Sequence, residues 1–323
     1  MPDATQRANG NGKFADVCRG LLNEFAALKP KRAGSLLITV YGDAIAPHGG
    51  TAWLGSLIRA AQPFGINHRL VRTSVFRLTR EGWLTSEKVG RRSYYGLTEL
   101  GRREVEAGSR RIYSVPPSDW SGIWGLVLLS GLEAAQRDEA RRRLRWLGFA
   151  SFMPNLMAHP SPDSAEVEAR LESLVDADRL LMMESKFATR SEAHLRSLVH
   201  RAWALEELGA RYRAFLDRFR LAFQAARNSR AIDPEMAFQV RTLMIHEYRK
   251  ILLRDPKLPE ALLPRDWDGV SAYQLCRNLY GLITPPAEEF LLTEMETADG
   301  PLRPADTQFS QRFGGLPVLP THI

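Results

Sequence analysis

The chain has 323 residues, a formal net charge of +7 and 44% hydrophobic residues, which suits a protein of two or three domains with buried cores. No apolar run approaches the roughly 20 residues of a membrane-spanning helix, and the N-terminus lacks a signal-peptide pattern. Cys18 and Cys276 lie far apart without metal-ligand spacing, so we expect no disulfide, no metal site and a reducing cytoplasmic location.

The first 33 residues predict an N-terminal extension with one helix. Residues 1–13 are polar and rich in Gly and Asn, which predicts disorder. Residues 14–28 carry apolar side chains at helical spacing, and Lys29-Pro30-Lys31-Arg32 ends the pattern. The mostly apolar stretch Ser35–Ile45 predicts the first core helix of the next domain, residues 34–113.

The stretch from Thr51 to Thr98 predicts a winged helix-turn-helix. We expect Thr51 to cap a first helix that Gln62-Pro63-Phe64-Gly65 ends, and Asn67 to cap a second helix that Gly82 ends. Two β-prone runs, residues 83–88 and 93–97, flank the turn at residues 89–92 and predict a hairpin. Thr98 is placed to cap a closing helix.

The second helix has an apolar and a cationic face. At about 100° per residue, Val71, Ser74, Val75 and Leu78 point one way, opposite most of the cations. Residues 51–113 hold twelve Lys and Arg against five Asp and Glu, an excess equal to the net charge of the whole chain. Such a surface favours DNA binding, although a merely solvated cationic face is the alternative. The predicted DNA-binding residues are Arg69, Arg72, Thr73, Arg77, Arg80, Lys88, Arg91 and Arg92.

Individual roles can be assigned within this set. Arg72 and Arg77 are the first candidates for base or phosphate contacts, because arginine pairs bidentately with guanine edges. Arg91 and Arg92 at the wing tip suit backbone or minor-groove contacts, with a solvated turn as the alternative. Phe76 lies on the cationic face, where it either touches a thymine methyl or, as we favour here, packs against the N-terminal arm.

The remaining residues predict two further domains and a tail, so the fold class is α+β. Pro116-Pro117 marks the start of the next domain, residues 114–190, which has the order βαββαβ of a ferredoxin-like domain. Its last helix carries Leu174 and Val175, and we expect its last strand, residues 180–183, to be buried. Residues 191–299 predict a helical C-terminal domain, with a long helix over 192–223, one from Pro234 to Leu253, and two more over 270–282 and 286–294. Residues 300–323 predict a loose tail.

Several motifs, taken in order, point to a family. The runs are Val71-Arg72-Thr73-Ser74-Val75-Phe76-Arg77-Leu78, Glu81-Gly82-Trp83-Leu84, Tyr95-Gly96-Leu97-Thr98, Ile245-His246-Glu247-Tyr248-Arg249-Lys250, Leu258-Pro259-Glu260-Ala261-Leu262-Leu263-Pro264, Asp266-Trp267 and Leu279-Tyr280. With these runs the chain resembles the phenylacetate-degradation repressors, or PaaX-type regulators, over nearly its whole length.

The resemblance implies a function and the three domains. It implies a cytoplasmic homodimer that represses an aromatic catabolic operon, binds double-stranded operator DNA, and leaves it when an aryl-CoA thioester, typically phenylacetyl-CoA, binds. It implies no enzyme and no cofactor. The middle domain would be related to small CRISPR-associated ferredoxin-like nucleases, which carry an acidic residue just after their first strand. Here no carboxylate follows Leu129 until Glu133, which argues against hydrolysis.

The effector site is predicted on the helical domain. Arg241, Arg249, Lys250 and Arg254 gather cations that suit the phosphates of CoA, and Trp267 and Tyr280 could wall an aryl pocket. The predicted effector-binding residues are Arg241, His246, Arg249, Trp267 and Tyr280. The favoured alternative makes these aromatic residues ordinary core residues and the cations a solvated face.

The sequence allows two other functions. One is a metal-dependent nuclease built on the middle domain, and the other is an architectural DNA-binding protein without a ligand. No catalytic triad stands out, and Lys250 occupies the position where a zinc-protease helix would need its second histidine. The roughly 100-residue helical region exceeds what a DNA clamp needs.

Overall fold

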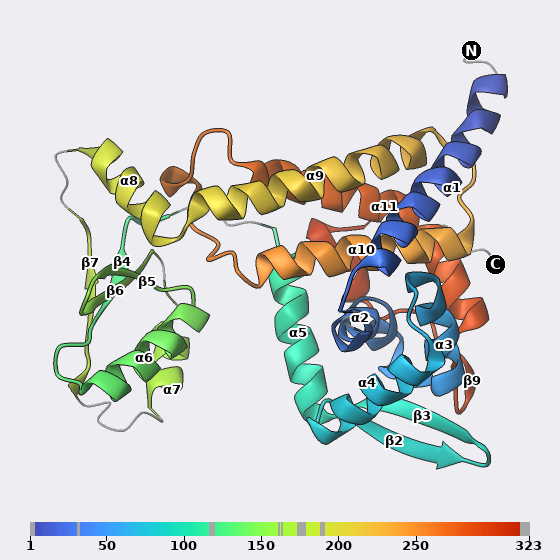
Figure 1. The fold of residues 1–323 in the computed structure, drawn as a ribbon, viewed down its shortest axis with the longest axis horizontal. Helices are drawn as coiled ribbons and strands as arrows, with labels where there is room; N and C mark the ends of the chain where they lie inside the picture. Colours follow the sequence, from blue (N-terminus) through green and yellow to red (C-terminus); the bar gives the residue numbers. More distant parts are fainter. Residues whose placement is uncertain are drawn as a thin grey trace. The chain divides into compact units, whose positions relative to one another are not determined.

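The computed structural model describes residues 4–30, 33–115, 120–160, 162, 164–172, 179–187 and 191–316, with side chains from residue 12 onward except those of residues 164, 166, 169 and 170. It divides the chain into two compact units (Figure 1). Unit 1 combines Met1–Val115, Ala214–Lys250 and Val270–Ile323, and unit 2 combines Pro116–Arg213 and Ile251–Gly269. The predicted helical segment 191–299 therefore does not stand alone, because unit 1 takes most of it and unit 2 the rest.

Unit 1 joins the N-terminal and C-terminal helices to a small three-stranded sheet. Its N-terminal elements are α1 (Ala4–Ala27), α2 (Ala33–Val40), the helical turns Tyr41–Ile45 and Ala46–His48, β1 (Thr51–Trp53), α3 (Leu54–Ala61), the turn Gln62–Phe64, α4 (His68–Arg80), β2 (Leu84–Val89), β3 (Arg92–Leu97) and α5 (Glu99–Tyr113). Its C-terminal elements are most of α9 (Leu205–Asn228), α10 (Pro234–Leu252) and α11 (Asp268–Glu294), then β8 (Glu296–Thr297), β9 (Gly300–Pro301) and the 3-10 segment Phe309–Gly314. No described helix is long and apolar enough to cross a membrane.

The winged helix-turn-helix is confirmed, with one change at its start. Thr98 caps α5 by accepting a hydrogen bond from the Gly101 amide at 3.0 Å. The strand order is β1-β3-β2, and Thr51 pairs with Gly96. The prediction that Thr51 caps a helix is therefore wrong, because the β-prone Thr51–Trp53 adds a third strand to the wing and α3 begins only at Leu54.

Both chain ends are more ordered than predicted. The expected disorder of residues 1–13 is wrong from residue 4 onward, since α1 begins at Ala4; residues 1–3 lie outside the described part, as do Lys31 and Arg32 of the predicted helix end. The loose tail is wrong for residues 300–316, because Arg312 and Phe313 are 7% and 1% exposed. Residues 317–323 of that tail lie outside the description.

The contact between α5 and the wing depends on Gly101. A Cβ atom there would overlap the carbonyl oxygen of Trp83, which is backbone and cannot move aside alone. We expect Gly101→Ala to lower the free energy of unfolding by about 1–3 kcal/mol, as overpacked cores do. Gly108→Ala on the same helix is the matched control: nothing lies within 4 Å of its Cβ position, so it should gain about 0.5–1 kcal/mol. Thermal unfolding followed by circular dichroism checks both, and equal effects would contradict the close contact.

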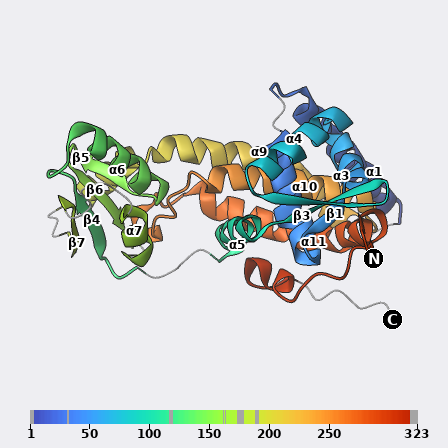
Figure 2. The same ribbon diagram turned by 90° about the horizontal axis from the view of Figure 1, so that it is seen from below.

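Unit 2 confirms the βαββαβ order. The elements are β4 (Trp124–Leu128), α6 (Ala134–Trp146), β5 (Ala150–Met153), β6 (Leu156–Pro160), α7 (Ser164–Leu171) and β7 (Leu181–Ser185). The antiparallel sheet has the order β5-β6-β4-β7, and α6 and α7 share one core cluster with its strands (Figure 2). Pro116, Pro117, Leu174 and Val175 lie outside the described residues. The expected burial of the last strand is wrong, because β7 is an edge strand with every residue exposed.

Two predicted helix boundaries are wrong. The helix expected over 192–223 breaks into α8 (Glu192–Ala202) and α9, because Trp203 turns its indole to the Gly148 carbonyl at 2.8 Å and Ala204 adopts a positive φ of 48°. The two helices expected over 270–294 are one, α11, which contains Pro285 and Pro286. Its buried face continues through Ile283, Thr284, Ala287 and Glu288, so packing outweighs the missing backbone donors.

Candidate nucleic-acid interface

The helix α4 is held by its apolar face and its N-cap. Gly65 turns the chain between α3 and α4 with a φ of 69°, and Asn67 then accepts a hydrogen bond from the Leu70 amide at 2.9 Å, as predicted. The buried residues of α4 are Val71, Ser74, Val75 and Leu78, the same four that the periodicity placed on the inner face. The opposite face of α4 is thereby fixed toward the outside of unit 1.

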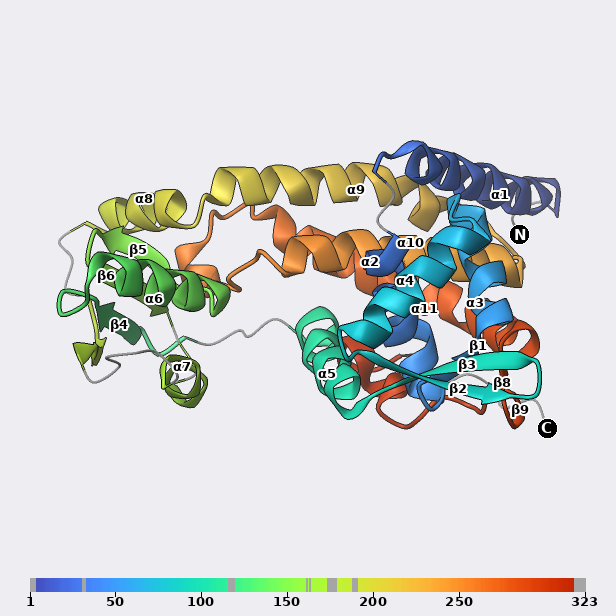
Figure 3. The same cartoon turned by 60° about the horizontal axis from the view of Figure 1, so that its bottom comes forward.

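That outer face and the wing carry the free cations. Arg69, Arg72 and Arg80 on α4, and Lys88 and Arg91 on the hairpin, are exposed. None of these five forms an ion pair with a residue that the structure describes. Figure 3 shows the β2–β3 hairpin extending beside α4 in the same unit. Gly90, with a φ of 60°, forms the hairpin turn and holds Arg91 at its tip. We refer to these five side chains as the cationic surface.

Arg77, one of the two first candidates for base contact, is turned toward its own unit. Its guanidinium lies over Gly34 of α2, where any added Cβ would overlap it. Its Nε lies 3.6 Å from the Glu81 carboxylate, one turn further along α4. Arg77 therefore contributes less free charge to the cationic surface than Arg72 does.

Arg92 is held by residues that sequence reasoning missed. Its Nη1 lies 2.5 Å from Oε2 of Glu296, and its guanidinium lies 4.3 Å from the Trp53 ring centroid. The hydrogen bonds that Arg92 makes with the side chains of Glu296 and Tyr94 raise the pKa of Arg92. Glu296 also lies 3.9 Å from Arg59. No local signal could reveal this cluster, because Glu296 is 204 residues away in sequence.

The Arg92–Glu296 pair should lower the affinity of the wing for DNA. Glu296→Gln should raise the affinity for a DNA duplex about two- to fivefold, since it removes a carboxylate beside the wing and releases Arg92 from an exposed pair worth at most about 1 kcal/mol. Fluorescence anisotropy at low salt measures the change. Glu294→Gln is the control, because Glu294 pairs with Arg59 and not with Arg92. A weaker duplex affinity for Glu296→Gln would show that Glu296 positions Arg92 for binding instead.

Phe76 does not pack as expected. Its side chain is 63% exposed on the cationic face of α4, so the favoured packing against the N-terminal arm is wrong. Thr73, one turn before it, donates its hydroxyl proton to the Arg69 carbonyl at 2.9 Å. The predicted Thr73 therefore presents no free hydroxyl donor.

Two of the predicted effector residues belong to a buried charge network in unit 1. Arg241, fully buried, lies 3.0 Å from Asp43 and 2.7 Å from Glu288. Tyr280 donates to Asp43 at 2.9 Å, and Arg312 donates to the Tyr280 hydroxyl at 2.6 Å. Both side chains are therefore occupied inside the core, which agrees with the favoured alternative for Tyr280 and contradicts a solvated face at Arg241. Asp43 was missed, although a lone acid in the apolar run Ser35–Ile45 signals a buried partner.

The other three predicted effector residues are divided between the units: His246 and Arg249 belong to unit 1 and Trp267 to unit 2. His246 is 2% exposed and lies 3.0 Å from the Thr39 hydroxyl. Trp267 belongs to unit 2, where its ring meets Tyr212 edge to face at 5.7 Å. Arg249 is half-buried and donates to the carbonyl and hydroxyl oxygens of Ser35, at 3.1 and 2.9 Å. Burial lowers the pKa of Arg249, and it has no carboxylate partner among the described residues.

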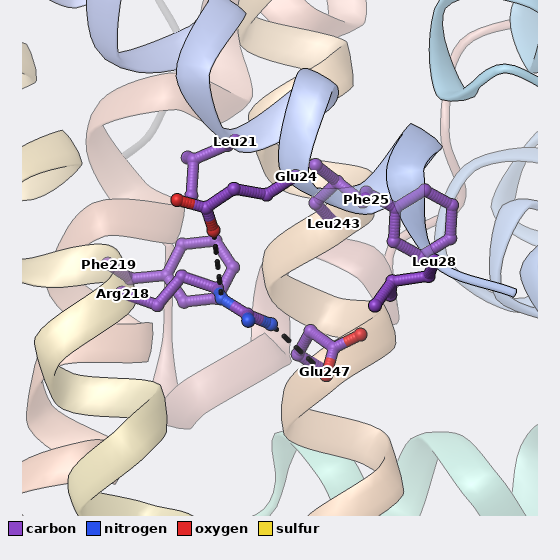
Figure 4. A pocket seen from close by; sticks show the side chains of 8 residues that line it. All are labelled: Leu21, Glu24, Phe25, Leu28, Arg218, Phe219, Leu243 and Glu247. Carbon is purple, nitrogen blue, oxygen red and sulfur yellow. Dashed lines mark ion pairs between the residues drawn. The ribbon is translucent and has the colours of Figure 1, made fainter.

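Two hollows in unit 1 are lined by other residues. A small one of about 10 Å³ lies between α1, α9 and α10, where Arg218 reaches toward Glu24 and Glu247 (Figure 4). A larger groove of about 840 Å³ runs along α3, the start of α10 and the end of α11. It carries the carboxylates of Asp233, Glu235, Glu289 and Glu294, a lining that repels the phosphates of CoA.

A three-stranded wing beside an outward cationic helix defines the class of winged-helix transcriptional regulators. Family models match the chain in three places: PaaX-like protein over residues 32–101, PaaX protein central Cas2-like domain over 117–197, and PaaX-like protein C-terminal domain over 203–293. The chain is 38% identical over 291 residues to the transcriptional repressor PaaX of Escherichia coli strain K12, covering 90% of this chain and 92% of that protein. It belongs to the PaaX family of transcriptional repressors.

A solved structure supports the fold alone. The uncharacterized protein Rv0674 from Mycobacterium tuberculosis has a TM-score of 0.50 and 21% sequence identity, over 79% of this chain and 96% of that one.

The present chain is a regulator and not an enzyme, as membership of a repressor family indicates. In the middle domain Glu133 is the N-cap residue of α6 and forms a capping box with Gln136, so this carboxylate has a structural role.

Proposed function

We propose that the chain binds operator DNA in a sequence-specific manner, represses an aromatic catabolic operon of the phenylacetate type, and is released by an aryl-CoA thioester. The cationic surface carries the DNA-binding part of this proposal. Its guanidinium and ammonium groups are exposed and without ion partners in the described part of the chain, so a phosphate backbone can replace their small counterions. A helix with this presentation enters the major groove in winged helix-turn-helix proteins.

Gel shift and anisotropy titrations on the DNA upstream of the gene test this part. We expect tight binding to that duplex, and at least a hundredfold weaker binding to a scrambled duplex of equal length and composition. Equal affinity for the two duplexes would refute sequence-specific repression and favour an architectural role.

The aryl-CoA part rests on family membership and on one residue. Of the five predicted effector residues, Arg249 alone has a half-buried guanidinium without a described carboxylate partner, and an anionic group would relieve the unfavourable burial of its charge. Its present partner, Ser35, lies in the first turn of α2, and α2 packs against α4. A phosphate that draws Arg249 away from Ser35 would therefore disturb the helix that supports α4. Release of the DNA requires that the thioester bind the DNA-free conformer more tightly than the DNA-bound conformer.

Phenylacetyl-CoA added to the protein–DNA complex tests the effector part, with free CoA and phenylacetate as controls. We expect release by the thioester alone. Arg249→Ala should remain bound at thioester concentrations that release the wild type, whereas the exposed Arg254→Ala should behave as the wild type. Release of Arg249→Ala at the wild-type concentration would exclude Arg249 from the effector site, and a complex insensitive to every CoA thioester would favour a ligand-independent protein.

We further propose that the operator holds a homodimer in the cytoplasm, with two copies of α4 about one helical turn of DNA apart. Light scattering on the purified complex measures the number of chains per duplex. Two chains per operator agree with the proposal, and one chain contradicts it.

A further inference from the structure

The cationic surface surrounds one exposed aromatic ring. Phe76 lies one turn from Arg72 and from Arg80 along α4, and 63% of its side chain is exposed. Among the other aromatic residues of this region, Phe64 and Tyr94 are buried at 0% and 5% exposure, and Trp53, Trp83 and Tyr95 are half-buried. An apolar ring in the middle of a charged helix face is costly to hydrate, so burying it against an apolar group of a bound partner is favourable.

Thr73 adds a second apolar group beside this ring. It precedes Phe76 by three residues, which places the two side chains next to each other on the helix surface. Because its hydroxyl proton goes to the Arg69 carbonyl at 2.9 Å, Thr73 cannot donate a hydrogen bond to a base. Thr73 can still offer its methyl group to an apolar partner and its hydroxyl oxygen as an acceptor. Phe76 and Thr73 together form an apolar spot on α4 between positions 72 and 80 of the helix.

The major groove offers one apolar group, the C5-methyl of thymine, and phenylalanine and the threonine methyl are side-chain groups that recognise it. We propose that Phe76 and Thr73 read a thymine methyl within the operator, while Arg72 and Arg80 bind the phosphates or guanine edges on either side. This inference rests on the proposed DNA-binding function and adds a base-specific contact that charge alone does not provide.

Removing single methyl groups from the DNA tests it. In the duplex that the protein protects from nuclease digestion, each thymine is replaced in turn by uracil, which changes only the C5-methyl. One or two replacements should weaken binding of the wild type about three- to tenfold, the effect of burying about one to two methyl-sized groups. Phe76→Ala should weaken binding to the thymine duplex by at least as much, and the same uracil replacement should then cause no further loss.

Control variants separate the contact between Phe76 and a thymine methyl from the general effect of changing an exposed apolar side chain. Leu100→Ala removes another exposed apolar side chain of unit 1, on α5, and should keep the full sensitivity to uracil. Phe76→Leu should retain part of the sensitivity to uracil that Phe76→Ala loses. Wild-type binding that no uracil replacement affects, or an undiminished uracil effect in Phe76→Ala, overturns the inference while leaving DNA binding intact. A wild-type chain that binds neither duplex overturns the proposed function as well.

Discussion

Replacing Arg241 with methionine should lower the free energy of opening of unit 1 by about 3–5 kcal/mol, because it removes the buried cation that Asp43 and Glu288 share and leaves Asp43 with Arg312 alone, at 3.2 Å. Arg241 is fully buried between Asp43 and Glu288, at 3.0 and 2.7 Å. Hydrogen–deuterium exchange of α10 and α11 measures this free energy separately from unit 2.

Arg218→Met is the matched control. Arg218 also lies between two carboxylates of unit 1, those of Glu24 and Glu247, but at 3.7 Å each and with 40% of its side chain exposed (Figure 4). Exposed pairs are worth at most about 1 kcal/mol, so this variant should lose little stability. Equal losses for the two variants would contradict a structural role of the buried network.

The same network predicts a loss of stability in acid. Burial opposes ionisation of Glu288, but the charge of Arg241 and the His48 imidazole, 3.1 Å away, outweigh it and lower the pKa of Glu288 from 4.5 to about 2. A carboxyl whose pKa is lower in the folded state stabilises the fold fully above pH 4.5, and the contribution, on the order of 3 kcal/mol, disappears as the pH falls to about 2. Glu288→Gln should show a flatter stability curve between pH 5 and 2 in hydrogen exchange of α11. An unchanged acid slope would contradict this pKa.

Arg72→Ala has the second largest expected effect, a loss of about five- to 150-fold in operator affinity, corresponding to about 1–3 kcal/mol for a bidentate base contact. Arg72 is exposed and unpaired among the described residues, so its removal should leave thermal unfolding unchanged. Anisotropy titration at fixed salt measures the affinity.

Arg77→Ala serves as its control, because Arg77 lies over Gly34 and near Glu81. We expect a loss of no more than about threefold from weaker long-range attraction. Unchanged affinity for Arg72→Ala would remove Arg72 from the interface, and a larger loss for Arg77→Ala would show that Arg77 leaves Glu81 to reach the DNA.

Features encoded by neighbouring residues could be predicted from the sequence. The caps at Asn67 and Thr98 and the positive φ of Gly82 depend on a few adjacent positions, and the structure has all three. The buried face of α4 and the βαββαβ order follow from periodicity over one element at a time. These signals suffice to place the cationic surface, because the inner face of a single helix determines which arginines remain outside.

Features that depend on distant residues could not be predicted. Arg241 looks like one cation among several along α10, and only the folded chain brings it to Asp43, 198 residues earlier. Trp203 breaks the long helix because Gly148 accepts its indole proton, a contact 55 residues away. The turn of Arg77 onto Gly34 and the capture of Arg92 by Glu296 are of the same kind. Sequence periodicity identified the cationic face, but packing determines which of its arginines are free.

The salt dependence of duplex binding tests the central claim most directly. For the full chain on its upstream DNA, the logarithm of the association constant should fall linearly with the logarithm of salt concentration, and the slope should shrink by about one unit in Arg72→Ala or Arg80→Ala. Arg77→Ala should shrink the slope by clearly less than one unit. Binding that is absent at 50 mM salt, or a slope that none of these substitutions alters, would contradict an outward face of α4 that meets DNA.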